Sequence, residues 1–193
     1  MNLIIFDLET TGLSPYHNEI IQIAAVKVRA GCWDLEGSFD TFVRPQQRVP
    51  KPITSLTGIT QSQVERAPSP VEALMSFSHF VGQEATLIAH NGPNFDMRFI
   101  KENCTRHGLP VRDTAMLDSQ AFSRKIWGGR GGHALDPVLQ RLGLSAAGVK
   151  RHDARGDVQL LAQAVRKMWA QLVPDFQSCP VATKIGLIPA LNP

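Results

Sequence analysis

The chain has 193 residues, of which 43% are hydrophobic and 19% are charged, and its formal net charge is +3. This length and composition are typical of one globular domain. Every apolar run falls short of the roughly 20 residues that a membrane helix needs, so we expect no membrane partner. A net charge this small is compatible with a polyanionic partner but does not by itself indicate one.

The cysteines and the first residues bear on the cellular compartment. Cys32, Cys104 and Cys179 lie far apart, and no CxxC pair is present, which argues against a disulfide framework and against a structural zinc site. The sequence that begins at Met1 lacks the basic start, long apolar centre and cleavage site of a signal peptide. We therefore expect a cytoplasmic location.

The first 45 residues have the pattern of β-strands. The segment "LIIFDLE" is short and apolar, residues 19–30 are rich in Ile and Val, and residues 37–45 alternate apolar and polar side chains. The turn over residues 31–36 predicts an antiparallel hairpin between the second and third of these strands. Residues 85–89 are all small or apolar, as in a strand that is covered on both faces.

Helices are expected to follow the first strands. Helical spacing of apolar residues predicts them over residues 61–82, 94–108, 114–126, 134–142 and 153–173. Strands followed by a mixture of strands and helices predict an α/β fold with a mixed sheet. We expect one domain over residues 1–173 and a loosely structured C-terminal arm over residues 174–193.

Two acids stand at the end of the first predicted strand. Alternate residues of a strand share a face, so Asp7 and Glu9 project to the same side as Leu3 and Ile5. If the strand has already left the core at this point, both carboxylates are simply solvated. If it has not, the two charges require a partner.

Further acids occur at comparable places. Asp96 and Asp157 each fall in the first turn of a predicted helix, where the helix dipole alone favours a carboxylate. Convergence of all four would be costly, since two like charges 4 Å apart repel by about 4 kcal/mol at an effective dielectric of 20. A hard divalent cation, Mg²⁺ or Mn²⁺, suits such a set of carboxylate oxygens.

One histidine is placed to complete this set. Asp153 is a good N-cap residue, so His152 belongs to the preceding loop and is free to face Asp157. An imidazole can accept a proton near neutral pH. The alternative is an ordinary surface histidine.

Three segments together carry a family resemblance. "FDLETTGL", "AHNGPNFDMRFI" and "HDARGD", with "TGIT" ending at Thr60, occur in the order and spacing of the three exonuclease motifs of the DEDDh (DnaQ-like) 3′-to-5′ exonuclease family. The resemblance covers about residues 2–170. The spacing from His90 to Asp96 and the form of "HDARGD" look closer to the TREX-type pattern than to that of other DnaQ-like members.

The resemblance implies a fold and a site. The fold would be ribonuclease-H-like, with a five-stranded mixed β-sheet flanked by α-helices. Two Mg²⁺ ions, for which Mn²⁺ substitutes, would be held by Asp7, Glu9 and Asp157, with Asp96 acting largely through water. His152 would take the proton from the attacking water.

The resemblance also implies contacts with a nucleic-acid end. Candidates to hold the terminal nucleotide are Thr10, Thr11, Leu13 and Leu56. Leu13 and Leu56 are alternatively core residues. Asn91 either contacts the substrate or caps the following helix, and capping is the favoured interpretation.

The implied activity is release of nucleoside 5′-monophosphates from single-stranded DNA or RNA 3′ ends, with DNA favoured, in proofreading or DNA repair. A polymerase or a second copy of the chain is a possible partner. Three alternatives stay open: a catalytically silent domain that binds nucleic acid or a polymerase, a ribonuclease-H-type endonuclease, and a metal-binding structural domain. The presence of all five motif residues argues against the silent domain.

Overall fold

The fold is built on one six-stranded sheet with the strand order β3-β2-β1-β4-β5-β6. This is a computed structural model, and it describes residues 2–149, 151–176 and 178–191. The strands are β1 (Asn2–Thr10), β2 (Ile20–Arg29), β3 (Leu35–Phe42), β4 (Ala85–Ala89), β5 (Val111–Asp118) and β6 (Lys184–Pro189). β1, β4 and β5 run parallel, whereas β2, β3 and β6 are antiparallel to their neighbours. The predicted α/β class, mixed sheet and hairpin are confirmed.

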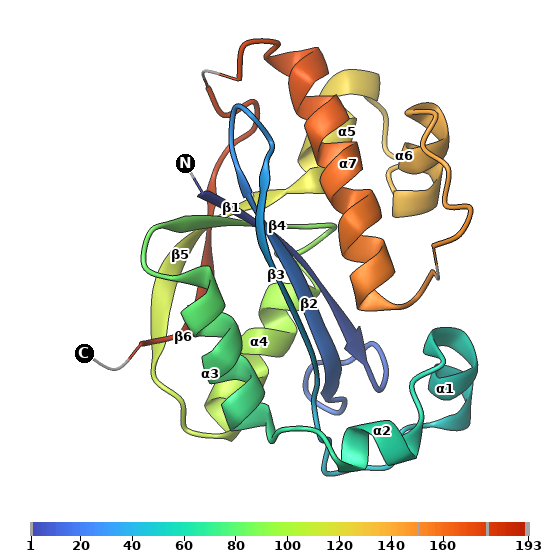
Figure 1. Cartoon of the computed structure of the whole chain (residues 1–193), viewed down its shortest axis with the longest axis vertical. Helices are drawn as coiled ribbons and strands as arrows, with labels where there is room; N and C mark the ends of the chain where they lie inside the picture. The colour runs from blue at the N-terminus through green and yellow to red at the C-terminus, as the bar shows by residue number, and fades with distance from the viewer. Residues whose placement is uncertain (1, 150, 177, 192–193) are drawn as a thin grey trace.

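Seven helices accompany the sheet in the described part of the chain. They are α1 (Lys51–Thr57), α2 (Gln61–Glu65), α3 (Pro70–Val81), α4 (Asp96–Arg106), α5 (Ser119–Trp127), α6 (Leu135–Arg141) and α7 (Ala154–Leu172). α3 and α4 cover one face, α5, α6 and α7 cover the other, and α1 and α2 lie apart from both layers at one end of the sheet (Figure 1). No helix in this part of the chain is long and apolar enough to cross a membrane.

Strand β1 serves both halves of the core. Ile4, Phe6 and Leu8 pack in the cluster that contains α3 and α4. Leu3 and Ile5 pack in the cluster that contains α7. The predicted alternation is therefore confirmed. Residues 7 and 9 continue the row of side chains formed by Leu3 and Ile5, so their side chains point to the face of the sheet that α7 covers.

The prediction of a helix from Thr114 is wrong for its first part. Residues 111–118 form β5, which pairs in parallel with β4, and the helix α5 begins only at Ser119. Ala115, Met116 and Leu117 are good helix formers in isolation. Pairing with β4 and burial of Met116 and Leu117 override that local preference.

The prediction of a loosely structured arm is wrong for residues 184–189, and the expected count of five strands is wrong for the same reason. β6 pairs antiparallel with β5 from Lys184 to Pro189. Ile188 is fully buried, and the Pro189 carbonyl accepts a 2.6 Å hydrogen bond from Ser78 Oγ on α3. Residues 177, 192 and 193 of the arm lie outside the described residues.

A buried carboxylate, that of Glu19, holds the segment that precedes α1. Glu19 is 3% exposed, and its two oxygens accept hydrogen bonds from the backbone N–H groups of Gln46 at 3.0 Å and Gln47 at 2.9 Å. Its own backbone pairs with Thr11 at the end of β1. Glu19 thus joins β1 to the segment that leads into α1.

Replacing Glu19 with alanine should lower the free energy of unfolding by about 1–3 kcal/mol, because two N–H groups lose a charged acceptor. Glu19→Gln keeps one acceptor oxygen and should lose less than half as much. Urea denaturation measures both changes. A Glu19→Ala protein as stable as the wild type would contradict this role.

Candidate active site

Three acids from two distant segments meet at the end of β1. Asp7 and Glu9 lie on the last part of that strand, and Asp157 lies in the first turn of α7. One carboxylate oxygen from each lies within 4.8 Å of the other two. The meeting follows from the fold, since the row of β1 side chains that packs on α7 continues into the two acids.

Asp96 approaches the same place from the other layer. It is the first residue of α4 and is 2% exposed, and its Oδ1 has no hydrogen-bond partner among the described residues. When ionised, Asp96 raises the pKa of Asp7, so the two carboxyl groups lie near each other. A buried carboxylate oxygen without a partner needs a cation, a water molecule or a proton.

Burial and crowding disfavour charge on these acids. Burial raises the pKa of Asp7 well above its usual range, and the negative charges of Asp96 and Glu9 raise it further. Burial likewise raises the pKa of Asp96 to about 8, although backbone N–H groups oppose the shift. A divalent cation would reverse both effects because it favours the ionised carboxylates.

The metal-free protein should therefore lose stability as the pH rises from about 4 to 8. Over this range the folded state holds a proton on Asp96 that the unfolded chain, with its ordinary pKa of 3.8, has released. The free energy of unfolding then falls with pH. We expect Asp96→Asn, which cannot ionise, to gain melting temperature over the wild type as the pH increases, by roughly 2–4 °C for each kcal/mol.

Thermal melts in EDTA across this pH range measure the difference, and repeats in Mn²⁺ should show a stabilisation of the wild type that grows with pH. A constant gap between Asp96→Asn and wild type would contradict the raised pKa.

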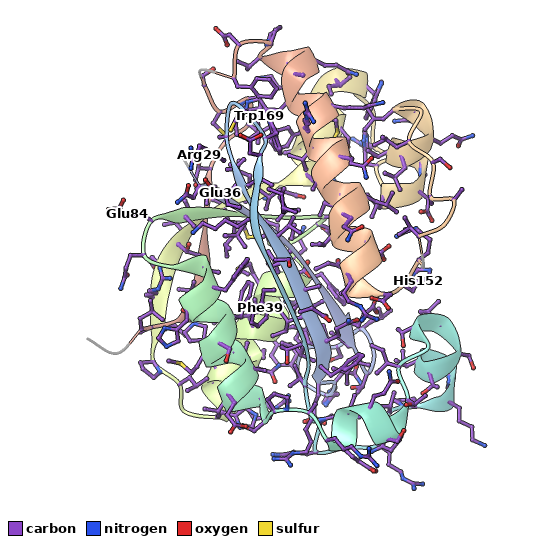
Figure 2. The ribbon with its side chains drawn as sticks, viewed as in Figure 1. Arg29, Glu36, Phe39, Glu84, His152 and Trp169 are labelled. Carbon is purple, nitrogen blue, oxygen red and sulfur yellow. The ribbon has the colours of Figure 1, made fainter. Side chains whose placement is uncertain are left out.

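His152 stands beside these acids on the loop before α7. The Asp153 side chain accepts a hydrogen bond from the Arg155 backbone N–H, so α7 is capped as predicted and His152 stays outside the helix. Its φ of 56° is left-handed, and its backbone N–H donates to Asp157 Oδ2 at 3.1 Å. Figure 2 shows His152 exposed at the end of α7 that faces α1.

A cleft of about 230 Å³ opens over the acids. Its polar side is formed by Asp7, Glu9, Asp157 and His152. The other lining residues are Leu8, Thr10, Gly12, Leu13, Ile53, Leu56, Thr57 and Phe95. The cleft is therefore lined by a carboxylate cluster and by an apolar wall, which we define as Leu13 of the β1–β2 loop with Ile53 and Leu56 of α1.

The leucines of this wall are exposed. Leu13 is 85% exposed and Leu56 is 53% exposed, which rules out the alternative that they are core residues. The loop that presents Leu13 is tight, since Asn18 Oδ1 accepts a hydrogen bond from the Ser14 N–H and lies where a side chain at Gly12 would be. An apolar side chain is thus held in solvent at the mouth of the cleft.

The two threonines are in different surroundings. Thr10 lines the cleft, and its Oγ1 donates to the Gly12 carbonyl at 2.6 Å. Thr11 is 4% exposed, and its Oγ1 accepts a hydrogen bond from the backbone N–H of Glu19. Thr11 therefore stabilises the loop and does not face the cleft.

Asn91 does not cap α4 with its side chain. The N-cap residue is Phe95, which makes no side-chain cap hydrogen bond, and the favoured interpretation is therefore wrong. Asn91 has a φ of 61°, and its backbone N–H donates to Asp118 Oδ1 at 3.0 Å. It shapes the turn between β4 and α4.

Sequence reasoning missed Phe95, Ile53 and Thr57 as residues of the cleft. Phe95 is half-buried, packs against Phe99 and the core, and also lines the cleft. Its place directly before Asp96 was the available signal. Ile53 and Thr57 belong to α1, a seven-residue helix that begins at Lys51–Pro52 and that the apolar pattern did not reveal.

The chemistry of this set fits hard divalent cations. All donors are carboxylate oxygens, three of them lie close together, and Asp96 supplies a buried oxygen without a partner. Mg²⁺ and Mn²⁺ prefer such ligands. The fold and the site together define a ribonuclease-H-like domain with an acidic centre at the end of its first strand.

The chain belongs to the exonuclease family. The family model described as "Exonuclease" (RNase_T) matches residues 4–165. With the motifs in place, the chain is a DEDDh, DnaQ-like member, as the sequence predicted.

Two similar proteins are named as DNA polymerase III proteins. A DNA polymerase III subunit epsilon-like protein of Rhodobacter capsulatus is 36% identical over 87% of this chain, and DNA polymerase III PolC-type of Streptococcus thermophilus is 38% identical over 74%. The matches cover 24% and 9% of those proteins, so the chain corresponds to one part of much longer polypeptides. The lean to a TREX-type pattern stays a prediction.

Solved structures share the fold. The nuclease domain of 3′hExo, described as a DEDDh family member bound to rAMP, has a TM-score of 0.79 at 22% identity and covers 95% of this chain and 96% of its own. Exonuclease I has a TM-score of 0.75 at 17% identity and covers 91% and 42%.

Proposed function

We propose that this chain is a metal-dependent 3′-to-5′ exonuclease that releases nucleoside 5′-monophosphates. The observation that carries the proposal is the convergence of Asp7, Glu9 and Asp157 beside His152 in a cleft with an apolar wall. Acids of this kind without a cleft would fit a structural metal site. An apolar cleft without acids would fit a binding module.

The residues divide the work of hydrolysis. Asp7, Glu9 and Asp157 would hold two divalent cations, and Asp96 would act through water from its buried position. When bound, such ions lower the pKa of the attacking water and stabilise charge on the phosphate and the leaving 3′ oxygen. His152 would accept the proton of that water, and its exposure lets the proton pass on to solvent.

The wall of the cleft would hold the last nucleotide. Leu13 and Leu56 are exposed apolar residues of its lining, and Phe95 is an aromatic residue of the same lining. A base that enters would bury these surfaces, which favours binding. Thr10 would contribute a polar contact from the cleft lining, and Thr11 would act by supporting the loop. Asn91 is not among the residues that line the cleft and would act by shaping the turn between β4 and α4.

DNA is the favoured substrate class. The relatives with 36–38% identity are named as DNA polymerase III proteins. One structural neighbour is described with a histone mRNA stem-loop. It is only 23% identical to this chain, so the likeness bears on the fold and not on the substrate. A role in proofreading or repair, a polymerase or homodimer partner and a cytoplasmic location are part of the proposal and rest on the same relatives and on the sequence.

Digestion of 5′-labelled single-stranded DNA and RNA of matched sequence tests the proposal. We expect a ladder that shortens from the 3′ end in Mg²⁺ or Mn²⁺, no digestion in EDTA, and faster digestion of DNA. Asp7→Ala protein from the same purification excludes a contaminating nuclease. Folded protein that binds but never cleaves either strand would instead support the catalytically silent binding domain.

A further inference from the structure

Arg151 lies at the acidic centre, although no motif of the sequence marks it. It directly precedes His152, and its side chain is 22% exposed. Its guanidinium forms an ion pair with Asp157 through Nη1 and Oδ1. Nε and Nη2 of the same group bind Asp136 Oδ1 on α6, at 3.0 and 2.6 Å. Arg151 thus bridges α6 and the first turn of α7.

Both oxygens of Asp157 are therefore in use. Oδ1 pairs with Arg151, and Oδ2 accepts the backbone N–H of His152 at 3.1 Å. The positive charge also reaches Asp7, where it opposes the rise in pKa that burial, Asp96 and Glu9 cause. Arg151 thus brings a positive charge to the cluster of acids through its contact with Asp157.

A divalent cation held by Asp157 would bind the same carboxylate that Arg151 already neutralises. Mg²⁺ binds carboxylate oxygens at 2.0–2.1 Å, and a guanidinium in direct contact with that carboxylate would meet the ion at close range with like charge. The two positive charges would repel each other across this one carboxylate, so we expect them to compete for it. Arg151 also forms an ion pair with Asp136, whose side chain is 69% exposed. The guanidinium can therefore remain bound to Asp136 after it separates from Asp157.

We infer that Arg151 is a positioning residue of the metal centre: its guanidinium neutralises Asp157 in the metal-free protein, and the entering ion takes Asp157 from it. The inference rests on the proposed function, since it presumes that the acids bind metal. It adds that metal affinity is set by competition with a residue of the chain. Because Arg151 and His152 are neighbours, entry of the ion also alters the loop that carries the proposed base.

Manganese binding tests the inference without any turnover. Titration of the full chain with Mn²⁺, followed by electron paramagnetic resonance of the free ion, gives the dissociation constant in the absence of nucleic acid. We expect Arg151→Gln to bind Mn²⁺ about tenfold more tightly than the wild type, because the ion no longer displaces an ion pair. Arg151→Lys keeps the charge but loses the fork that holds two carboxylates, so its affinity should lie between them.

Arg155→Gln is the matched control. Arg155 lies four residues further on and pairs with Asp153 and Asp40, neither of which belongs to the acidic cluster. It removes the same charge near the same helix end, and we expect its dissociation constant to stay within about twofold of wild type. The gain in Arg151→Gln should persist in 0.5 M KCl, because salt screens distant charges more than a partly buried contact.

Three results would overturn the inference. They are equal affinity of Arg151→Gln and wild type, an equal gain in Arg155→Gln, and loss of the gain at high salt, which would indicate a long-range field. Absence of Mn²⁺ binding in every protein would overturn the metal centre and this inference with it. Circular dichroism of each variant establishes that it is folded.

Discussion

Replacing Asp7 with asparagine is expected to lower turnover by about 10⁴-fold or more, which corresponds to roughly 5 kcal/mol of lost transition-state stabilisation. Asparagine keeps the shape of the side chain but removes one of the three charges that would hold the cations. Single-turnover digestion of a labelled oligonucleotide measures the effect, and Mn²⁺ titration should show weakened binding in parallel.

Asp113→Asn provides the comparison for this variant. Asp113 is an exposed residue of β5 and does not line the cleft, so the same change of charge there should leave the rate within about twofold of wild type. An Asp7→Asn enzyme that retains a tenth of the wild-type rate would remove Asp7 from the metal centre.

Replacing His152 is expected to cost about 10²- to 10⁴-fold in kcat, the usual contribution of a general base. Asparagine is the better substitute here than alanine, because the φ of 56° at this position is one that asparagine adopts readily. The backbone N–H that donates to Asp157 remains. Two affinities of the variant should therefore stay within a few-fold of those of the wild type. They are the affinity for an oligonucleotide, measured in Ca²⁺, and the affinity for Mn²⁺.

His79→Asn serves as the control for histidine loss, since His79 is exposed in the last turn of α3 and does not line the cleft. It should leave kcat unchanged. A His152→Asn enzyme with wild-type kcat would exclude His152 as the base, whereas loss of Mn²⁺ binding would assign it a structural role.

Much of the acidic centre could be predicted from the sequence because local patterns position its residues. Strand alternation placed Asp7 and Glu9 on one face, and the N-cap at Asp153 placed His152 outside α7. These patterns depend on neighbouring residues alone. Family motifs then supplied what local patterns lack, namely that segments far apart in the chain meet.

The features that escaped prediction depend on distant contacts. β5 is a strand because β4 is available to pair with it, although Ala115, Met116 and Leu117 favour a helix in isolation. Leu13 and Leu56 could be assigned to core or surface only once α1 had been placed. Arg151 gives no signal in the sequence, since its importance lies in where Asp136 and Asp157 are in space.

The order of strands has a consequence during synthesis of the chain. β6 lies next to β5 in the sheet, but α5, α6 and α7 are made between them. At ribosomal rates this interval is on the order of seconds, during which β5 presents an unpaired edge. We therefore expect nascent chains that stop before residue 184 to be the aggregation-prone species and the preferred clients of chaperones, with release from them timed by the arrival of β6.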